Sequence, residues 1–293
     1  MAEQRRRRTA IVATVARTER LSASLVRVVV GGEAMSGFAP GPFTDSYVKV
    51  VFVHPDVPRP LALTDDGRVD LEAAGQGEHA PRMRSYTVRA FDPATRELTL
   101  DFVVHGTAGI AGPWAAAARA GDEVLLVGPG GAYVPDPEAG RHLLAGDLSA
   151  LPAITASLEA LPPHAVGHAL VEVHGPEDEL PLSAPAGVEV RWLHQLQQGD
   201  RRPGEALADA VRTLPWPDDD VHAFVHGEAG AVKEIRRLLR VERGLELDRL
   251  SISGYWRLGV DDEGWRASKR EWNTAIEEAE SAVAPRSTES AAV

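Results

Sequence analysis

The pattern of this sequence changes near residue 140, and the change limits the folds that the chain can adopt. Before that point, short runs rich in Val, Ile and Thr alternate with Gly, Pro and Asp. Short strands at such spacing predict a small antiparallel β-barrel. From Arg141 onward, apolar strand-like runs alternate with helical segments, which predicts an α/β domain with a doubly wound parallel sheet. We therefore expect two domains, residues 1–138 and 139–266, followed by a helix and a tail in residues 267–293.

The individual elements follow from the same patterns. The barrel is expected to have strands at 11–16, 24–30, 47–52, 85–91, 98–105 and 123–127, a helix at 111–118 and a long surface loop at 54–82. The second domain is expected to have strands at 142–145, 167–173, 188–193, 221–225 and 250–253 and helices at 149–160, 204–213 and 229–242. Val134 to Pro137 form the expected linker, Ser268 to Val283 an amphipathic helix, and residues 285–293 a disordered tail.

Composition excludes several classes of function. The net charge of -12 argues against nucleic acid as a partner, because binding phosphate backbones needs a basic field. The absence of cysteine excludes disulfides, thiolate nucleophiles and iron–sulfur clusters, so any electron transfer would need an organic cofactor. No run approaches the ~20 apolar residues of a membrane span, and the basic residues Arg5 to Arg8 do not lead into a signal-peptide core. We expect a cytoplasmic protein without membrane insertion.

The segment Arg84-Ser85-Tyr86-Thr87-Val88-Arg89 has the residue types that a flavin needs. The guanidinium of Arg84 can hold a pyrophosphate through two parallel hydrogen bonds. The ring of Tyr86 can lie against an isoalloxazine, and the hydroxyl of Thr87 can reach its reactive edge. The alternative is an edge strand with a solvated arginine, since short motifs recur by chance.

A second candidate segment follows one strand later. Asp101 to Gly106 lead into Gly109-Ile110-Ala111-Gly112-Pro113-Trp114, where glycines at a helix start let backbone N–H groups approach an anion. A pyrophosphate shared with Arg84 fits this position. The alternative is a plain turn with a glycine cap.

Two strand-turn-helix segments lie at the expected carboxyl edge of the parallel sheet, where ligands bind in doubly wound folds. They are Ala145 to Pro152, with Asp147 and Ser149, and His226 to Lys233, with Gly227 and Glu228. Neither is a Gly-x-Gly-x-x-Gly motif, and the alternative role for Asp147, Ser149 and Glu228 is helix capping. Ser149 has no Gly-x-Ser-x-Gly elbow, so a hydrolase is not supported. Pro162, Pro163 and Gly167 break any helix that would pair His164 with His168, so no metal site is expected.

Taken together, these segments resemble the siderophore-interacting protein family, the flavin-dependent ferric-siderophore reductases of the ferredoxin–NADP reductase-like superfamily. The resemblance runs from about residue 10 to residue 266 and rests on residues 84–89, 101–106, 109–114, 121–122, 128–131, 145–152, 227–230 and 252–257. Leu148 and Ser149 stand where the family usually has Glu and Thr, and Ile110 stands where Pro is usual. The missing Glu leaves the choice of electron donor open.

The resemblance implies an FAD-binding barrel and a domain that binds NADH or NADPH, with Tyr86 and Thr87 closest to the chemistry. On the FAD it implies contacts from Arg84, Ser85, Tyr86, Thr87, Asp101, Val103, His105, Gly109, Ala111, Gly112 and Trp114. Around the cleft between flavin and nicotinamide it implies Asp147, Ser149, Ala150, Gly227, Glu228, Tyr255 and Trp256.

The implied reaction passes electrons from NADH, NADPH or ferredoxin through FAD to Fe(III) in a ferric siderophore, with release of Fe(II). Lys49 and Arg257 would form a basic rim for an anionic siderophore, although Lys49 can equally be a solvated strand lysine. Arg191, Arg201 and Arg202 are candidates for the 2′-phosphate of NADPH. We expect a monomer. The alternatives are a flavin reductase or diaphorase with a quinone or redox-protein acceptor, and a nonenzymatic flavin- or siderophore-binding protein.

Overall fold

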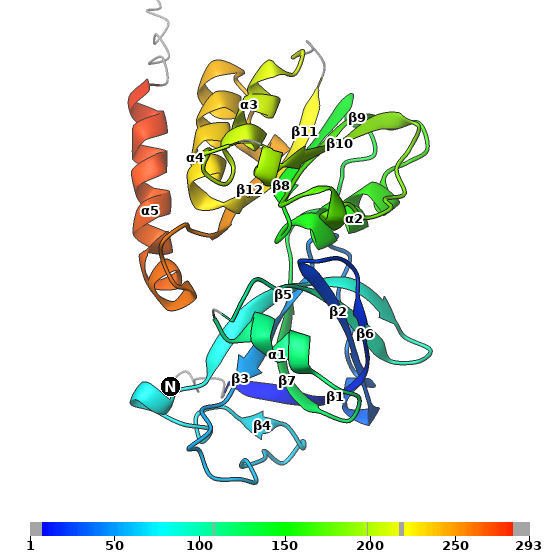
Figure 1. Cartoon of the computed structure of the whole chain (residues 1–293), viewed down its shortest axis with the longest axis vertical. Helices are drawn as coiled ribbons and strands as arrows, with labels where there is room; N and C mark the ends of the chain where they lie inside the picture. The colour runs from blue at the N-terminus through cyan, green and yellow to red at the C-terminus, as the bar shows by residue number, and fades with distance from the viewer. Residues whose placement is uncertain (1–7, 108, 198, 217–219, 284–293) are drawn as a thin grey trace, which may run out of the picture.

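The first part of the chain closes into a barrel. The computed structural model describes residues 8–107, 109–197, 199–216 and 220–283. Six antiparallel strands pair in the order β2-β6-β5-β3-β7-β1, and β1 returns to β2, so the sheet closes and β4 is added at its edge (Figure 1). The strands are β1 (Thr9–Arg20), β2 (Leu25–Gly31), β3 (Tyr47–Phe52), β4 (Val69–Asp70), β5 (Arg82–Asp92), β6 (Glu97–Val103) and β7 (Glu123–Gly130), and the helix is α1 (Ala111–Ala117).

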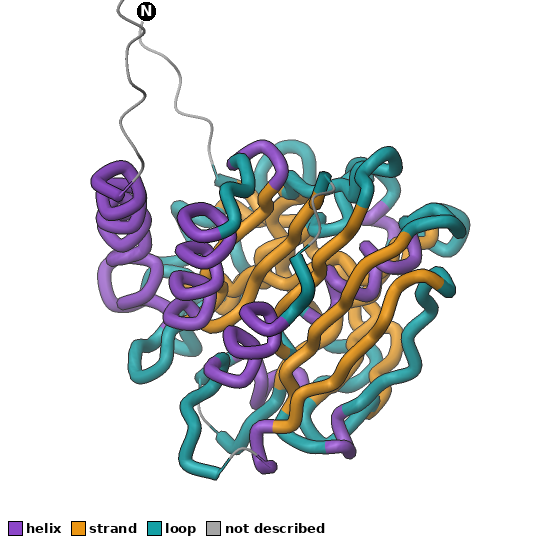
Figure 2. Tube along the Cα trace, turned by 90° about the horizontal axis from the view of Figure 1, so that it is seen from above, coloured by secondary structure: helices purple, strands orange, loops and turns teal. Residues whose placement is uncertain are grey.

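The second part is a parallel sheet between helices. Its strands lie in the order β10-β9-β8-β11-β12, and helices cover both faces (Figure 2). The strands are β8 (Arg141–Asp147), β9 (Val166–Val173), β10 (Gly187–His194), β11 (Val221–Glu228) and β12 (Leu250–Trp256). The helices are α2 (Leu151–Ala160), α3 (Glu205–Thr213), α4 (Ala229–Arg237), which continues into a π-helical turn (Leu238–Glu242), and α5 (Asp262–Val283). The expected fold class is confirmed.

The three larger apolar cores among the described residues explain this arrangement. The barrel is filled by residues that alternate along its strands, such as Val28, Val48 and Leu100. Ile154 and Leu158 of α2 pack on one face of the parallel sheet, and a separate core forms with α3 and α4 on the other. The continuous burial of β11 fits a strand covered on both faces.

Several boundaries differ from the sequence predictions. Helix α5 begins at Asp262, six positions before the predicted Ser268, because the Oδ1 of Asp261 accepts a hydrogen bond from the Gly264 N–H at 2.8 Å and caps the helix start. Helix α2 begins at Leu151, and Ser149 lies in the turn before it. Strand β7 continues to Gly130, beyond the predicted end at Val127. The predicted surface loop at 54–82 contains the short strand β4, and the predicted tail at 285–293 lies outside the described residues.

Polar contacts fix one domain on the other. Asp178 has no exposed surface, and its carboxylate accepts hydrogen bonds from the hydroxyl of Ser22 (2.7 Å) and the hydroxyl of Ser24 (2.8 Å) in the barrel. Arg89 of β5 forms two hydrogen bonds with the carboxylate of Glu159 on α2. The carboxyl edge of the parallel sheet is thereby held next to the barrel. No helix in the described part of the chain is long and apolar enough to cross a membrane.

Candidate functional site

The segment from Arg84 to Thr87 lies in the middle of β5 and alternates between its two faces. Arg84 pairs with Val50 of β3 and Tyr86 with Val48, whose side chains belong to the barrel core. Ser85 pairs with Lys49, so these two side chains lie on the opposite face, together with Thr87. The structure therefore brings Arg84 and Tyr86 together, and Lys49 lies with Ser85 and Thr87 instead. Thr87 is only 8% exposed.

Tyr86 is part of an aromatic cluster at the margin of the barrel core. Its ring centroid is 4.0 Å from that of Phe102, which lies 5.4 Å from Trp114 of α1. Burial raises the pKa of the Tyr86 phenol above its ordinary value, so the phenol stays neutral at physiological pH. The predicted flavin-packing tyrosine and Trp114 thus belong to one apolar surface.

Arg84 binds anions supplied by the chain itself. Its guanidinium donates to both oxygens of the Glu263 carboxylate, at 2.7 and 2.9 Å, and lies 2.9 Å from the Oδ2 of Asp262. The hydrogen bond from Arg84 lowers the pKa of Glu263, whereas burial raises that of Asp262. The side chain of Arg84 is 14% exposed, against 32% and 46% for its two partners. The first turn of α5 therefore occupies the position where the sequence predicted a pyrophosphate.

No role for the C-terminal helix is predicted from the sequence, yet this helix reaches both domains. Trp265 is 2% exposed, and the Nζ of Lys269 donates to the hydroxyl of Ser253 on β12 at 2.9 Å. Arg236 of α4 forms two hydrogen bonds with the carboxylate of Glu280. On the barrel side, Arg266 donates to the carbonyl oxygen of Met83 at 2.7 Å. The acidic run from Asp261 to Glu263 was the sequence feature that could have suggested a partner for an arginine, but nothing in the sequence connects this run to Arg84.

The start of α1 has the features of the second predicted segment. Gly109 is exposed with a φ of 77°, and the helix begins after Ile110 without a side-chain cap. A Cβ on Gly112 would lie 3.2 Å from the carbonyl oxygen of Val103, so the glycine permits close packing of α1 on β6, and Ala111 is buried there. The backbone N–H groups of this first turn have no side-chain partner among the described residues.

The other predicted residues of this region have different surroundings. Asp101 is buried and accepts two hydrogen bonds from Arg27 at 2.7 and 2.8 Å. Val103 packs against the core shared with the second domain, whereas His105 is exposed beyond the end of β6. Asp101 thus has a partner within the barrel, and His105 is open to solvent.

Asp147 connects three strands at the carboxyl edge of the parallel sheet. Its Oδ2 accepts the backbone N–H of Glu228 and the indole N–H of Trp256, both at 2.8 Å. Its Oδ1 accepts the N–H of Ser149 at 2.9 Å and the Ser149 hydroxyl at 2.5 Å. Burial raises the pKa of Asp147, and these donors act against that shift. Both carboxylate oxygens are satisfied by the chain, so Asp147 holds the edge in place.

The turn from β11 into α4 is shaped by the same carboxylate. Gly227 has a φ of 145°, and a Cβ there would lie 2.6 Å from the Oδ2 of Asp147. The carboxylate of Glu228 accepts the N–H of Ala231 at 2.9 Å, which caps α4, and the N–H of Leu258 at 3.1 Å. Asp147, Ser149, Gly227, Glu228 and Trp256, all predicted from the sequence, are therefore in direct contact.

Two further predicted residues differ in exposure. Ala150 has no exposed surface, whereas Tyr255 is half-buried and packs on the ring of His226 with centroids 4.8 Å apart. Leu148, which stands where the family usually has Glu, is 5% exposed and belongs to the apolar core. The departure from the family pattern thus places an apolar side chain in an apolar site.

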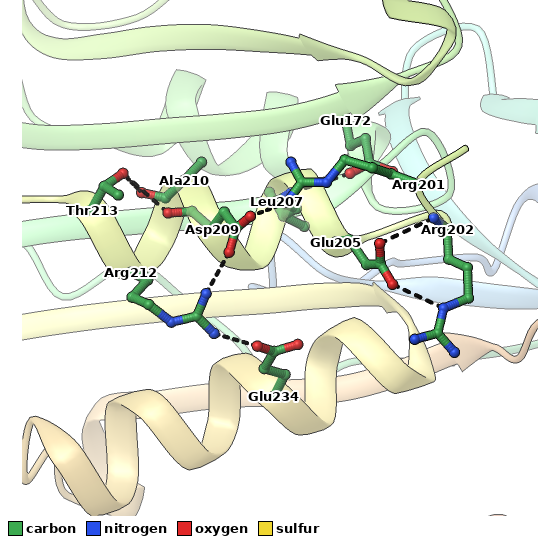
Figure 3. Close-up of polar contacts among 10 residues, drawn as sticks. All are labelled: Glu172, Arg201, Arg202, Glu205, Leu207, Asp209, Ala210, Arg212, Thr213 and Glu234. Atoms are coloured by element: carbon green, nitrogen blue, oxygen red, sulfur yellow. Dashed lines mark hydrogen bonds and ion pairs between the residues drawn. The ribbon is translucent and has the colours of Figure 1, made fainter. Parts of the chain in front are cut away.

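Two of the three candidate arginines for a 2′-phosphate pair with acidic side chains. Arg201 contacts Asp209 and Arg202 contacts Glu205, while Arg212 of α3 bridges Asp209 and Glu234 of α4 (Figure 3). The Nε of Arg191 is buried without a hydrogen-bond partner in the described part of the chain. For the predicted rim, Lys49 is half-buried and Arg257 is exposed, and neither side chain has an ion-pair partner among the residues described.

These residues fit an anionic dinucleotide. Arg84 already binds two carboxylates in the geometry that suits phosphate, and uncapped N–H groups lie at the start of α1. Tyr86 adds an aromatic surface beside Arg84. A pyrophosphate with an attached aromatic ring matches this set of donors and surfaces.

A barrel followed by this parallel sheet is the two-domain architecture of the ferredoxin–NADP reductases. The Plasmodium falciparum ferredoxin–NADP+ reductase has the same fold, with a TM-score of 0.59 and 9% identity over 84% of this chain and 96% of that chain. The model of the siderophore-interacting FAD-binding domain matches residues 14–133, and that of siderophore-interacting protein matches residues 139–259. The chain belongs to the siderophore-interacting protein family and is a siderophore-related flavin reductase with FAD as its cofactor.

Named relatives and solved structures agree with this family. The chain is 36% identical to the ferric vibriobactin reductase ViuB of Vibrio cholerae, over 86% of this chain and 91% of that protein. It is 33% identical to the NADPH-dependent ferric-chelate reductase of Escherichia coli, over 83% and 91%. A siderophore utilization protein from T. fusca superposes with a TM-score of 0.73 at 35% identity, over 86% of this chain and 94% of that chain.

Proposed function

We propose that this protein passes electrons from NADPH or NADH through FAD to Fe(III) in a ferric siderophore and so releases Fe(II). The anion-binding geometry of Arg84 beside Tyr86 is the observation that carries the proposal. The names of two relatives, a ferric vibriobactin reductase and an NADPH-dependent ferric-chelate reductase, support the acceptor and the donor. Because NAD(P)H is a cytoplasmic metabolite, we place the reaction in the cytoplasm, with the chain acting as a monomer.

FAD supplies the step between a two-electron donor and a one-electron acceptor. One NAD(P)H provides a hydride, which carries two electrons, and each Fe(III) accepts one, so two ferric complexes are reduced for each NAD(P)H and one proton is released. Oxygen-rich siderophores hold hard Fe(III) better than Fe(II). Reduction therefore works as a release step without any iron ligand from the protein.

On the barrel, Arg84 would exchange Asp262 and Glu263 for the FAD pyrophosphate. The N–H groups around Gly109, Ala111 and Gly112 would donate to the same phosphates. Tyr86 would pack on the isoalloxazine, with Ser85 and Thr87 approaching from the other face of β5. Val103 and His105 would lie toward the ribityl and adenosine side.

On the second domain, Asp147 acts through the groups that it holds. Its hydrogen bonds fix Ser149, Glu228 and Trp256, and Ser149 and Gly227 would face the nicotinamide. Lys49 and Arg257 would attract an anionic ferric siderophore, because two cations without ion-pair partners among the described residues can compensate charge locally in an acidic protein.

The reaction can be tested with the purified protein under anaerobic conditions. The absorbance spectrum should show bound flavin that bleaches on titration with NADPH or NADH. Ferric siderophore should then restore the oxidised spectrum, while a ferrous chelator reports two Fe(II) for each NAD(P)H. Reoxidation that is faster with a quinone than with any ferric complex would replace the proposal by a diaphorase activity. Bleaching only by reduced ferredoxin would change the donor, and a colourless protein that binds no flavin would end the proposal.

A further inference from the structure

Three side chains converge at the base of the long segment that joins β3 to β5. The Nδ1 of His54 lies 3.6 Å from the Oδ2 of Asp56, and the Nε2 of His79 lies 3.8 Å from the same oxygen. One ligand atom from each residue lies within 4.8 Å of the others. The two imidazole rings are tilted with respect to each other, with centroids 4.5 Å apart and an interplanar angle of 58°. This trio, called here the loop-base cluster, takes no part in the proposed reaction.

The backbone brings the two ends of the segment together. His54 begins a turn closed by a hydrogen bond from the Val57 N–H to the His54 carbonyl oxygen, at 3.0 Å, with Pro55 at its second position. His79 ends a short 3-10 helix, Gly77–His79. Gly75 has a φ of 124°, and a Cβ there would lie 2.1 Å from the His79 carbonyl oxygen and 3.1 Å from the Cγ2 of Val57. Glycine therefore permits the close approach that places His79 against the His54 turn.

The spacing of the three groups suits a metal ion. With bonds of ~2.1 Å, two ligands of a tetrahedral ion lie about 3.4 Å apart. The two separations that involve Asp56, 3.6 and 3.8 Å, are within a few tenths of an ångström of this value, and the ligand atoms of the two histidines lie within 4.8 Å of each other. The backbone N–H of Asp56 donates to the Nδ1 of His54 at 3.3 Å. An imidazole nitrogen has one lone pair, so a metal ion bound at this nitrogen would displace that long hydrogen bond.

The exposure and the chemistry of the three side chains also suit a metal ion. The side chains of His54, Asp56 and His79 are 27%, 74% and 42% exposed, so an ion can enter from solvent and water can complete its coordination. Two imidazoles and one carboxylate suit divalent first-row transition metals better than Mg²⁺ or Ca²⁺, which prefer oxygen ligands.

We propose that the loop-base cluster binds one divalent first-row transition-metal ion. The ion would tie residue 54 to residue 79 and so close the segment between them, which holds only the short strand β4 and the 3-10 turn at Gly77–His79. Closing a long flexible segment removes conformational entropy from the open states. Strand β5, with Arg84, begins three positions after His79, so the same ion would fix the entry of that strand. The proposal does not depend on the proposed reductase activity.

Binding is measured by titrating the chelator-treated full-length protein with Co(II). The visible absorption of Co(II) changes when nitrogen and oxygen ligands bind the ion. Zn(II) is then added to displace the bound Co(II). One equivalent should bind to the wild-type protein. His54→Gln and His79→Gln should each weaken binding by roughly tenfold or more, and Asp56→Asn by a smaller factor. His164→Gln, at an exposed histidine of the second domain, is the matched control and should bind as the wild type does.

A second measurement guards against a variant that simply folds poorly. Limited proteolysis should cut the segment between His54 and His79 more slowly when Zn(II) is added to the wild-type protein, and at the same rate with and without Zn(II) in His79→Gln. Circular dichroism checks that each variant is folded. Undiminished Co(II) binding in the double variant His54→Gln/His79→Gln, or no binding to the wild-type protein at millimolar Co(II), would overturn the proposal.

Discussion

Asp147 and Arg84 each join distant parts of the chain through a charged group, but their partners differ in kind. The carboxylate of Asp147 is satisfied by backbone N–H groups, a hydroxyl and an indole that belong to the edge of a buried sheet. The guanidinium of Arg84 is held by carboxylate side chains in the first turn of a terminal helix, one of them 46% exposed. The partners of Asp147 cannot leave without loss of structure, whereas those of Arg84 can be exchanged. The first group therefore serves the fold, and the second is suited to a ligand.

The largest effect is expected from Asp147→Ala. The change leaves the N–H of Glu228 and the indole of Trp256 without an acceptor in a buried place, which should cost about 3 kcal/mol of unfolding free energy. Thermal unfolding followed by circular dichroism should show a clearly lower midpoint. Ser149→Ala, which removes only one donor to the same carboxylate, is the control and should cost ~1 kcal/mol. A midpoint within about a degree of the wild type in Asp147→Ala would contradict the structural role.

Arg84→Ala should act on the ligand and leave the fold intact. Losing a charged hydrogen-bond donor to a pyrophosphate costs about 1.5–3 kcal/mol, or roughly 10- to 150-fold in the Kd for FAD. Flavin fluorescence during titration of the flavin-free protein measures that Kd. Arg89→Ala is a matched control, because Arg89 lies on the same strand and also binds a carboxylate with two hydrogen bonds, that of Glu159. Equal loss of affinity in both variants would assign the effect to the strand and not to Arg84.

The sequence predicted the local parts of this comparison better than the distant ones. Each strand-turn-helix segment at the carboxyl edge was visible, because in a parallel sheet strand ends meet at one edge and Asp147, Gly227 and Trp256 all follow from that rule. The opposite faces of Tyr86 and Thr87 also follow from the two-residue period of a strand. The contact of Arg84 with Glu263 spans 179 positions. No local pattern encodes such a contact, which arises only when α5 docks on the second domain. The loop-base cluster was missed for the same reason, since His54 and His79 meet only through the fold of the loop between them.

A pH-dependent loss of stability should come from two buried histidines of the parallel sheet, His142 and His226. Burial lowers the pKa of His226 to about 3, and that of His142 to about 4, whereas the unfolded chain binds a proton near pH 6.5. Stability is therefore fully present above pH 6.5 and falls as the pH drops toward these folded values, by about 1.4 kcal/mol per pH unit for each histidine. His226→Phe should flatten the change in unfolding midpoint between pH 7 and pH 5, whereas His164→Phe, at an exposed position, should not. An unchanged slope in His226→Phe would show that this histidine does not stay neutral.

The smallest effect is expected from Glu263→Gln and Asp262→Asn, which test directly whether FAD replaces these carboxylates at Arg84. If it does, removing either negative charge should tighten FAD binding. An exposed ion pair contributes 0.2–1 kcal/mol, so the Kd for FAD should fall by roughly 1.5- to 5-fold. Glu271→Gln, an exposed acid farther along the same helix, controls for the change in net charge. Weaker FAD binding in Glu263→Gln would mean that the carboxylate positions Arg84 for the phosphate, and the contrast with Asp147 would then disappear.

The two carboxylates at Arg84 can be separated by pH. Burial raises the pKa of Asp262, whereas the hydrogen bond from Arg84 lowers that of Glu263. As the pH falls through the raised pKa of Asp262, this carboxyl becomes neutral first and stops competing for Arg84, while Glu263 stays charged. The wild-type protein should therefore bind FAD somewhat more tightly as the pH is lowered toward the acid limit of its stability, and Asp262→Asn should not show that gain. A gain that persists in Asp262→Asn and disappears in Glu263→Gln would assign the competing charge to Glu263 alone.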